Sequence, residues 1–197
     1  MQDRVRMLTR PPRHHFFGYY GVNAWDPTLR RHLALEADFH EHRPTAADRA
    51  TVGLVDAATG AFRPVAQTPA FNLQQGSMMH WIEAGHGPEF TYNDWTGERL
   101  VSRAVNPDTL AMRTLQAAIA AVSPVAPIGL GLNYVRMSKC RPVVGYDLLP
   151  DVPLGEPYPR DDGIWRIDLR SGEAQLLLAV ADVVAALPDP RTREGAA

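Results

Sequence analysis

Three short stretches of this sequence concentrate side chains that can bind a metal ion, an acidic group or a sugar. The first is "HHFFGYYG" (residues 14–21), which contains His14, His15, Tyr19 and Tyr20. Imidazoles ligate metals or hydrogen-bond to acids, and aromatic rings stack on sugars. In a strand, alternation places His14 and His15 on opposite faces. The alternative is that the rings pack between sheets while both imidazoles bond to backbone.

The second stretch is "NLQQGSMMHW" (residues 72–81), which contains Gln74, Gln75, His80 and Trp81. Gln and His side chains are suitable hydrogen-bonding or metal partners. The glycine between them permits a bulge or a close backbone approach. The alternative is a buried strand, with the methionines, the histidine and the tryptophan shared between its two faces.

The third stretch is "YPRDDGIW" (residues 158–165), which contains Arg160, Asp161 and Asp162. An arginine beside carboxylates can hold an anionic or hydroxylated ligand, because its guanidinium pairs acids as a fork. The alternative is a solvated turn that enters a strand, since Asp-Gly is a common turn signal.

A metal site is a further interpretation of these stretches. His15, Gln75 and His80 are the candidate ligands, and Mn²⁺ or Ca²⁺ is the candidate ion. His40 and His42, in "FHEH", have alternating spacing that can clip a metal, but their polar surroundings favour solvated side chains.

Composition excludes several classes of function. The net charge is −2 and charged residues make up 21% of the chain, so no general attraction to nucleic acid or to an anionic membrane is expected. No apolar run approaches the ~20 residues of a membrane span. There is no P-loop, G-x-G-x-x-G, G-x-S-x-G, H-E-x-x-H or C-x-x-C motif. A single cysteine, Cys140, fits a reducing compartment, and we expect a cytoplasmic protein.

The elements that must position these residues follow from a weak internal repeat. Three segments share an apolar strand, a turn and a second strand, and they are residues 53–66, 102–115 and 165–178. Asp56, Asn106 and Asp168 occupy the same place, where an Asx side chain can start a turn. Gly60 and Gly172 follow four residues later and supply the positive φ at which a hairpin closes.

The middle repeat departs from this pattern, because Leu110 stands where the other repeats have glycine. Its turn is therefore expected to close in another way. Two strand-like runs, rich in aromatic and branched residues, precede each repeat. They are residues 14–21 and 30–37, 76–82 and 89–95, and 117–124 and 127–134.

The sequence thus predicts an all-β protein made of about three four-stranded propeller blades, a fragment of a six- or seven-bladed propeller. The blades are expected at residues 14–68, 71–116 and 117–180, after an N-terminal extension over 1–13. The tail from 181 to 197 is expected to fray after an apolar stretch that favours a short helix. Propellers carry ~4 to 8 blades, so either the chain is truncated or two copies meet. A β-sandwich and a mixed α+β domain are the alternatives, with 117–122 helical in the latter.

Two loops and two asparagine-containing pairs complete the prediction. Residues 38–50 form a polar insertion, and residues 141–162 form a long Pro-rich loop of a kind that is often functional or mobile. Asn93 with Asp94, and Asn133 with Tyr134, end corresponding strands. Their repetition favours a structural hydrogen bond in each unit.

The stretches "HHFFGYY", "GLVDAATG", "QQGSMMHW", "YND" and "DDGIWRIDLRSGE" resemble bacterial proteins of the TolB-like propeller group. Among characterised relatives, the oligogalacturonate lyases are the nearest. The resemblance covers about residues 14–180 and implies a propeller fold. For the lyases it implies β-elimination of uronate oligomers at a manganese ion held by histidines and a glutamine. Those ligands fall in later blades and have no match in this chain.

Together these features predict a module that binds a carbohydrate or another polar small molecule in a central pocket, derived from a polysaccharide-lyase-type enzyme. The alternative is a non-catalytic scaffold that binds protein through residues 45–50 and 141–162. A third interpretation is a truncated chain without independent function, whose partners are the missing blades or a second copy of itself.

Overall fold

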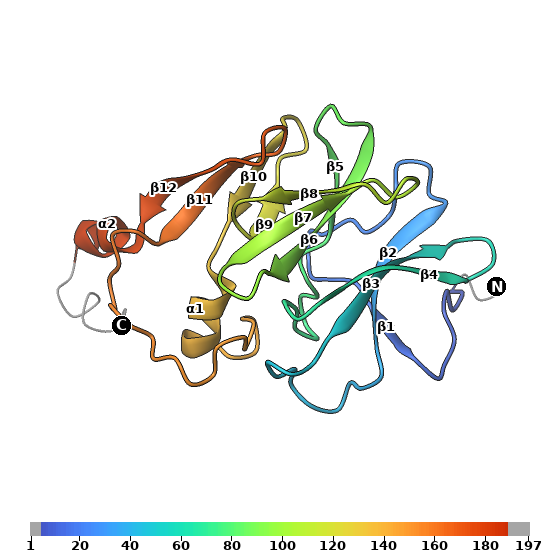
Figure 1. Cartoon of the computed structure of the whole chain (residues 1–197), viewed down its shortest axis with the longest axis horizontal. Coiled ribbons are helices and arrows are strands. Elements are labelled where there is room, and N and C mark those ends of the chain that lie inside the picture. The colour runs from blue at the N-terminus through green and yellow to red at the C-terminus, as the bar shows by residue number, and fades with distance from the viewer. Residues whose placement is uncertain (1–4, 189–197) are drawn as a thin grey trace.

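The computed structural model describes residues 5–188 and is built mainly from β-strands. These strands form three antiparallel sheets, each a meander of four consecutive strands. Figure 1 shows the sheets in chain order along the long axis of the molecule. The expected all-β character is confirmed, and each sheet lies within one of the three expected units. Within residues 5–188 every sheet stays open, with two edge strands.

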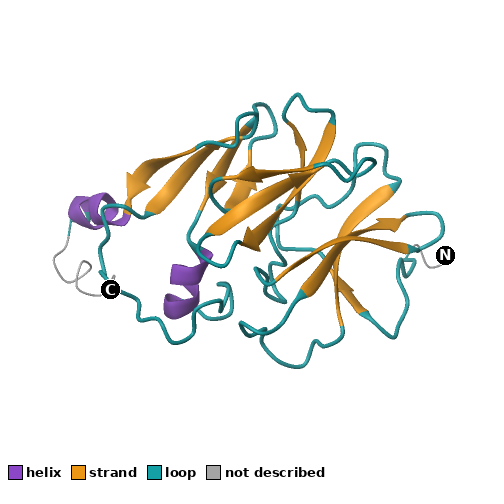
Figure 2. Cartoon of the chain, in the orientation of Figure 1, coloured by secondary structure: helices purple, strands orange, loops and turns teal. Residues whose placement is uncertain are grey.

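The strands are short, and of the two helices one lies between β10 and β11 and the other follows β12 (Figure 2). The first sheet contains β1 (His14–Phe16), β2 (Arg31–Ala37), β3 (Ala50–Asp56) and β4 (Phe62–Thr68). The second sheet contains β5 (His80–Glu83), β6 (Pro88–Trp95), β7 (Leu100–Val105) and β8 (Met112–Leu115). The third sheet contains β9 (Ile119–Val122), β10 (Ile128–Gly131), β11 (Gly163–Asp168) and β12 (Ala174–Ala179). The helices are α1 (Tyr134–Cys140) and α2 (Val180–Ala186).

Neither helix resembles a membrane span. Both have seven residues, and no helix among residues 5–188 is long and apolar enough to cross a bilayer. The helix α2 occupies the start of the segment expected to fray, where the apolar stretch favoured a short helix. The rest of that tail, residues 189–197, lies outside the described residues.

The three repeated hairpins close through the predicted Asx turns. The Oδ1 atoms of Asp56, Asn106 and Asp168 each accept hydrogen bonds from the backbone N–H groups two and three residues later. Gly60 and Gly172 then adopt φ values of 74° and 82°, in the left-handed region that glycine tolerates. The local chemistry of these residues is therefore sufficient to form the turns.

The expectation that the middle turn closes differently is wrong. Leu110 has a φ of 61°, and its N–H donates to the Asn106 carbonyl at 2.9 Å, as Gly60 donates to Asp56 at 2.8 Å. A β-carbon in this conformation costs roughly 1–2 kcal/mol because it crowds the backbone. The Leu110 side chain is 47% exposed, so solvent accommodates it without a second clash.

Apolar faces of neighbouring sheets form two of the buried clusters. Leu33, Leu35 and Val52 of the first sheet pack in one cluster with Phe90 and Tyr92 of the second sheet. Burying such side chains stabilises the fold by roughly 1.5–3 kcal/mol each. The second and third sheets meet in the same way, through a cluster that contains Ala104, Leu115, Ile119 and Ile167.

Asn93 on β6 joins these layers with polar bonds. Its Nδ2 donates to the Ile119 carbonyl at 2.9 Å and to the Tyr146 hydroxyl at 3.1 Å. Its Oδ1 accepts from the Ser102 hydroxyl at 2.6 Å and from the Ile119 N–H at 2.8 Å. The side chain is fully buried and fully bonded, so the predicted structural role of Asn93 is confirmed.

Three predicted strands are shorter in the structure. The strand expected over 14–21 ends at Phe16, and the one expected over 76–82 begins only at His80. The strand expected over 127–134 ends at Gly131 because Asn133 caps α1, accepting a hydrogen bond from the Arg136 N–H at 3.0 Å. The predicted structural role of Asn133 therefore takes the form of a helix cap.

The Pro-rich loop after α1 is bonded to the rest of the chain. The Tyr146 ring is buried and stacks on Tyr134, with ring centroids 4.6 Å apart. The Arg136 guanidinium donates to the carbonyls of Leu154, Glu156 and Pro157. These contacts give the loop a fixed path over the fold.

Candidate functional site

One large hollow lies where three parts of the chain meet. Its volume is about 840 Å³, and it is bounded by the connection between β1 and β2, by β5, and by residues 120–127 around the β9–β10 turn. We call it the Trp81 cavity. Its lining includes the following chemically distinctive side chains: Tyr20, Trp25, Leu29, Met78, His80 and Trp81.

His80 is a buried polar residue in the lining of this cavity. It is the first residue of β5, pairs with Thr91 of β6, and is only 8% exposed. Its Nε2 has no hydrogen-bond partner among the described residues. Burial lowers the pKa of the imidazole from its ordinary value of 6.5 to about 4. The ring is therefore neutral at pH 7, and its Nε2 is a buried nitrogen without a partner among the described residues.

Trp81, the next residue of β5, also lines the cavity and is held in place by two contacts. Its Nε1 donates to the Ala24 carbonyl at 2.9 Å, which ties the indole to the connection between β1 and β2. The Arg31 guanidinium lies 5.4 Å from the centre of the ring, a cation–π distance. Both contacts hold the indole in one orientation, with the guanidinium over one face of the ring.

Asp26 positions that arginine and the turn around it. Its carboxylate accepts from the Arg30 and Arg31 N–H groups, from the Thr28 hydroxyl, and from the Arg31 guanidinium at 3.1 Å. Burial raises the pKa of Asp26, but these hydrogen bonds outweigh burial and lower it. The carboxylate is thus charged and fully used, which makes Asp26 a positioning residue.

Backbone strain gathers at the same cavity. Met78 and Leu29 have φ values of 50° and 57°, in the region that residues with a β-carbon rarely adopt. Both line the Trp81 cavity, and Met78 is only 7% exposed. Such conformations cluster at binding and catalytic sites, where surrounding contacts hold them in place.

The structure separates the predicted site residues into different places. Tyr20, His80 and Trp81 line the Trp81 cavity, whereas His15 lines another hollow of about 340 Å³ beside Glu36. The His15 Nε2 lies 3.1 Å from the Glu36 Oε2, at ion-pair distance but without hydrogen-bond geometry. His15 and His80 therefore do not share a cavity.

The other residues of the first stretch face outward. The His14 Nε2 lies 3.2 Å from the His40 Nδ1, and the Tyr19 ring lies against Tyr20. His42 stacks on Phe39 with ring centroids 4.1 Å apart. Among residues 5–188, no group of three or more His, Cys, Asp or Glu side chains could hold a metal ion.

The two glutamines lie in a tight loop ahead of β5. The Asn72 Oδ1 accepts hydrogen bonds from the N–H groups of Gln74 and Gln75. The Gln74 side chain is exposed, and the Gln75 Oε1 is buried without a partner among the described residues. Neither glutamine lines the Trp81 cavity.

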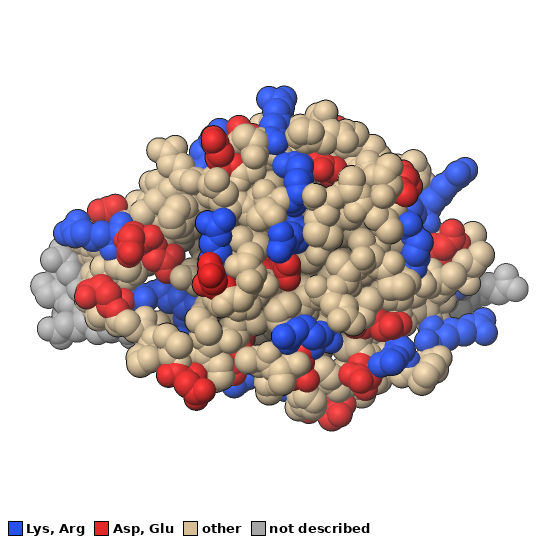
Figure 3. Space-filling model, in the orientation of Figure 1, with Lys and Arg blue, Asp and Glu red and all other residues tan. Residues whose placement is uncertain are grey.

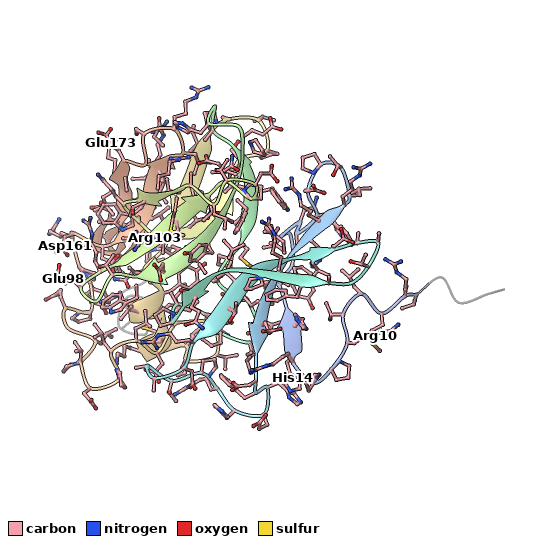
Figure 4. The ribbon with its side chains drawn as sticks, turned by 45° about the vertical axis from the view of Figure 1, so that its right-hand side comes forward. Arg10, His14, Glu98, Arg103, Asp161 and Glu173 are labelled. Carbon is pink, nitrogen blue, oxygen red and sulfur yellow. The ribbon has the colours of Figure 1, made fainter. Side chains whose placement is uncertain are left out.

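The third predicted stretch lines a separate hollow of about 620 Å³ between the second and third sheets. Asp161 and Asp162 border it, together with Trp165, while the Arg160 side chain is exposed. The Asp162 carboxylate accepts from the Asn133 Nδ2 at 2.9 Å, which helps to fix the entry to β11. Figure 4 shows Asp161 on one side of the molecule and His14 on the other.

The lining residues outside the predicted set include Trp25, Asp26, Leu29 and Met78. The sequence contained one usable signal, because the Asp26-Pro27 pair marks a turn directly after a tryptophan. The left-handed backbone of Met78 and Leu29 leaves no mark on the residue types, since both prefer other conformations.

Charge does not single out a binding face. On the side shown in Figure 3, arginines and lysine alternate with acidic side chains, and no large area carries one sign. This distribution agrees with the net charge of −2. The described lining of the Trp81 cavity contains no arginine or lysine.

Comparisons with known proteins give no family assignment. No protein-family model, curated protein or solved structure matches the chain. The resemblance to TolB-like propellers therefore remains a prediction from the sequence, and function must be argued from the cavity itself.

Proposed function

We propose that the three sheets are propeller-type blades whose inner edges border a binding pocket. Two features support this arrangement. Each sheet is a four-stranded antiparallel meander, as in a propeller blade. The first strand of the second sheet, β5, contacts the first strand of the third sheet, β9, so these first strands lie side by side.

We further propose that the Trp81 cavity binds an uncharged, hydroxyl-rich small molecule, with a sugar ring as the best fit. The observation that carries this proposal is the buried, unpartnered Nε2 of His80, a residue that lines an aromatic-rich hollow. An unpaired buried nitrogen costs about 1–3 kcal/mol, and a ligand hydroxyl would recover that cost. The indoles of Trp81 and Trp25 offer flat surfaces for the apolar face of the ring.

The lining favours a neutral sugar over a uronate. A carboxylate ligand needs a cation or several N–H donors, and none of the cavity's described lining residues is arginine or lysine. His80 is neutral at pH 7 and does not replace them. β-Elimination of a uronate also requires stabilisation of the carboxylate, so we propose binding without lyase activity.

Tryptophan fluorescence tests this function, because the four tryptophans divide between two cavities. Trp25 and Trp81 line the Trp81 cavity, and Trp95 and Trp165 line the 620 Å³ hollow. We expect neutral galactose, glucose or xylose oligosaccharides to change the emission, and oligogalacturonate of equal length to leave it unchanged. The change should persist in Trp165→Phe and shrink in Trp81→Phe, where Trp25 alone still reports from the cavity.

His80→Leu is the decisive variant, and His86→Leu is its matched control. His86 is exposed and bonds to the Arg170 carbonyl, away from the Trp81 cavity. We expect His80→Leu to weaken sugar binding about tenfold or more, since one hydrogen bond of ~1.4 kcal/mol is lost. Unchanged affinity in His80→Leu, or tighter binding of oligogalacturonate than of neutral sugars, would refute the proposal.

A further inference from the structure

A second hollow lies between the N-terminal segment and the first sheet. Its volume is about 340 Å³, and its lining comes from residues 8–13, from His15 and Glu36, and from the β3–β4 turn over 59–62. We call it the His15 hollow. It shares no lining residue with the Trp81 cavity, so a ligand in one hollow is independent of a ligand in the other.

The N-terminal segment is held against the first sheet at three points. The Arg6 guanidinium donates to a carbonyl of the β3–β4 turn, and Arg13 lies 3.5 Å from the Asp38 carboxylate. A β-carbon at Gly60 would clash with the Leu8 carbonyl, so the segment passes directly over this turn. The His15 hollow is therefore bounded on every listed side by positioned backbone.

His15 is a buried polar residue in the lining of this hollow. Its side chain is 9% exposed, and both ring nitrogens are buried without a hydrogen-bond partner among the described residues. The Glu36 Oε2 lies 3.1 Å from Nε2, and the Phe62 ring packs edge-on against the imidazole. A buried nitrogen without a partner is costly, so such atoms are uncommon unless a water or a ligand bonds them.

Positive charge predominates around the histidine. Arg10 and Arg13 line the hollow, and Glu36 is the only acidic residue in its described lining. Arg10 extends from the N-terminal segment beside the first sheet (Figure 4), and its guanidinium has no partner among the described residues. The ion pair of Arg13 with Asp38 is exposed and therefore weak. Because arginine pairs oxyanions through several N–H groups, this lining favours an anionic ligand.

We propose that the His15 hollow binds a small oxyanion of the phosphate type. Arg10 and Arg13 donate to the anion from the N-terminal segment, and the His15 Nδ1 donates from β1. The imidazole is then protonated on both nitrogens and lies between two acids, with its Nε2–H toward Glu36. Both nitrogens are covered in this structure, so a small rotation of the ring accompanies binding.

The shape of the anion follows from the positions of these donors. They come from two separate segments of the chain, on different sides of the hollow. A tetrahedral oxyanion presents acceptors in several directions, whereas a carboxylate presents two in one plane. Phosphate is therefore expected to bind more tightly than a carboxylate.

An NMR titration of ¹⁵N-labelled protein with inorganic phosphate tests the site, at pH 7 and at an ionic strength kept constant with sodium chloride. We expect the resonances of Arg10, His15 and Gly60 to shift together and to saturate with one dissociation constant. A general effect of salt on the protein surface does not saturate in this way. Sulfate should act like phosphate, and acetate should bind about tenfold more weakly or less tightly still.

Arg10→Gln and Arg160→Gln are a matched pair of variants. Both arginines are exposed, and Arg160 lies outside the lining of the His15 hollow. Arg10→Gln should raise the phosphate dissociation constant about tenfold, because a charge-assisted hydrogen bond is lost. Arg160→Gln removes the same charge and should leave the dissociation constant unchanged.

His15→Leu tests the buried nitrogen, with His14→Leu as its control. His14 lies at hydrogen-bond distance from His40 and does not line the hollow. We expect only His15→Leu to weaken phosphate binding about tenfold. If His15→Leu does not fold, the Arg10→Gln result decides. The proposal is overturned by a wild type without saturable shifts, by equal affinity in Arg10→Gln and Arg160→Gln, by wild-type affinity in folded His15→Leu, or by acetate that binds as tightly as phosphate.

Discussion

Asn93 and His80 are both buried polar residues of the second sheet, and they differ in what their side chains bond. Every polar atom of the Asn93 side chain has a protein partner, and those bonds join the second sheet to β9 and to Tyr146. His80 is nearly as buried, yet its Nε2 has none among the described residues. Asn93 therefore holds the sheets together, whereas we propose that the unpartnered nitrogen of His80 bonds a ligand.

The difference has an energetic meaning. At Asn93 the cost of burying an amide is offset by four hydrogen bonds, so the residue stabilises the fold. At His80 the cost of burying the nitrogen is not offset within the protein. The residue therefore lowers the free energy of unfolding of the ligand-free protein. Variants of the two residues should therefore change stability in opposite directions.

The largest effect is expected from Asn93→Ala. The substitution leaves the Ser102 hydroxyl, the Ile119 backbone and the Tyr146 hydroxyl with broken bonds, and should lower the free energy of unfolding by about 3 to 5 kcal/mol. Urea denaturation measures the change. The control is Asn23→Ala, whose exposed side chain accepts one bond from the Trp25 N–H and should cost about 1 kcal/mol or less. Equal losses in both variants would contradict a joining role for Asn93.

The next largest effect is a pH dependence that belongs to His80. Because its pKa is near 4 in the folded state and 6.5 when unfolded, the unfolded chain binds a proton that the folded chain does not between these values. Acidification from above pH 6.5 to about pH 4 should therefore lower the free energy of unfolding by about 3 kcal/mol through this group. Above pH 6.5 His80 is neutral in both states, so it does not make the free energy of unfolding depend on pH.

Denaturation of wild type and His80→Leu over this pH range checks the prediction. Other acidic groups titrate alike in both proteins, so the difference between the two free energies isolates His80. We expect His80→Leu to gain relative to wild type as the pH falls from 6.5 to 4. If the free energies of unfolding of the two proteins instead change in parallel with pH, the His80 imidazole is not buried as a neutral base.

The sequence predicted local features better than the cavity. The Asx turns at Asp56, Asn106 and Asp168 form because their bonds lie within a few residues, so residue type alone indicates them. The four-stranded units follow from the same turns. Even here a local rule failed at Leu110, where the rest of the hairpin imposes a backbone that leucine disfavours.

The cavity depends on contacts that alternation does not encode. A period of two predicts which residues share a face of a strand, but not which neighbouring segment that face meets. His15 and His80 were expected in one pocket, and the structure places them in two. Trp25 enters the Trp81 cavity through the connection between β1 and β2, whose path is set by long-range packing.

A smaller effect distinguishes strain outside the cavity from strain inside it. Leu110 and Met78 both have positive φ, but Leu110 is exposed in a hairpin turn and Met78 lines the cavity. Leu110→Gly should raise the free energy of unfolding by about 1 kcal/mol, because relief of strain outweighs the added freedom of the unfolded chain. Thermal denaturation measures the gain, and sugar affinity should not change. A loss of stability would show that the turn is not strained.

The most direct test of the account is the state of the His80 ring nitrogens in solution, observed by ¹⁵N NMR of labelled protein at pH 7. We predict a neutral imidazole in the free protein, and a shift of the Nε2 resonance when a neutral oligosaccharide is added at saturating concentration. The spectrum of the other imidazoles should stay unchanged. A protonated His80 in the free protein, or an Nε2 resonance that ignores a bound sugar, would contradict the claim that this nitrogen is left unpaired for a ligand.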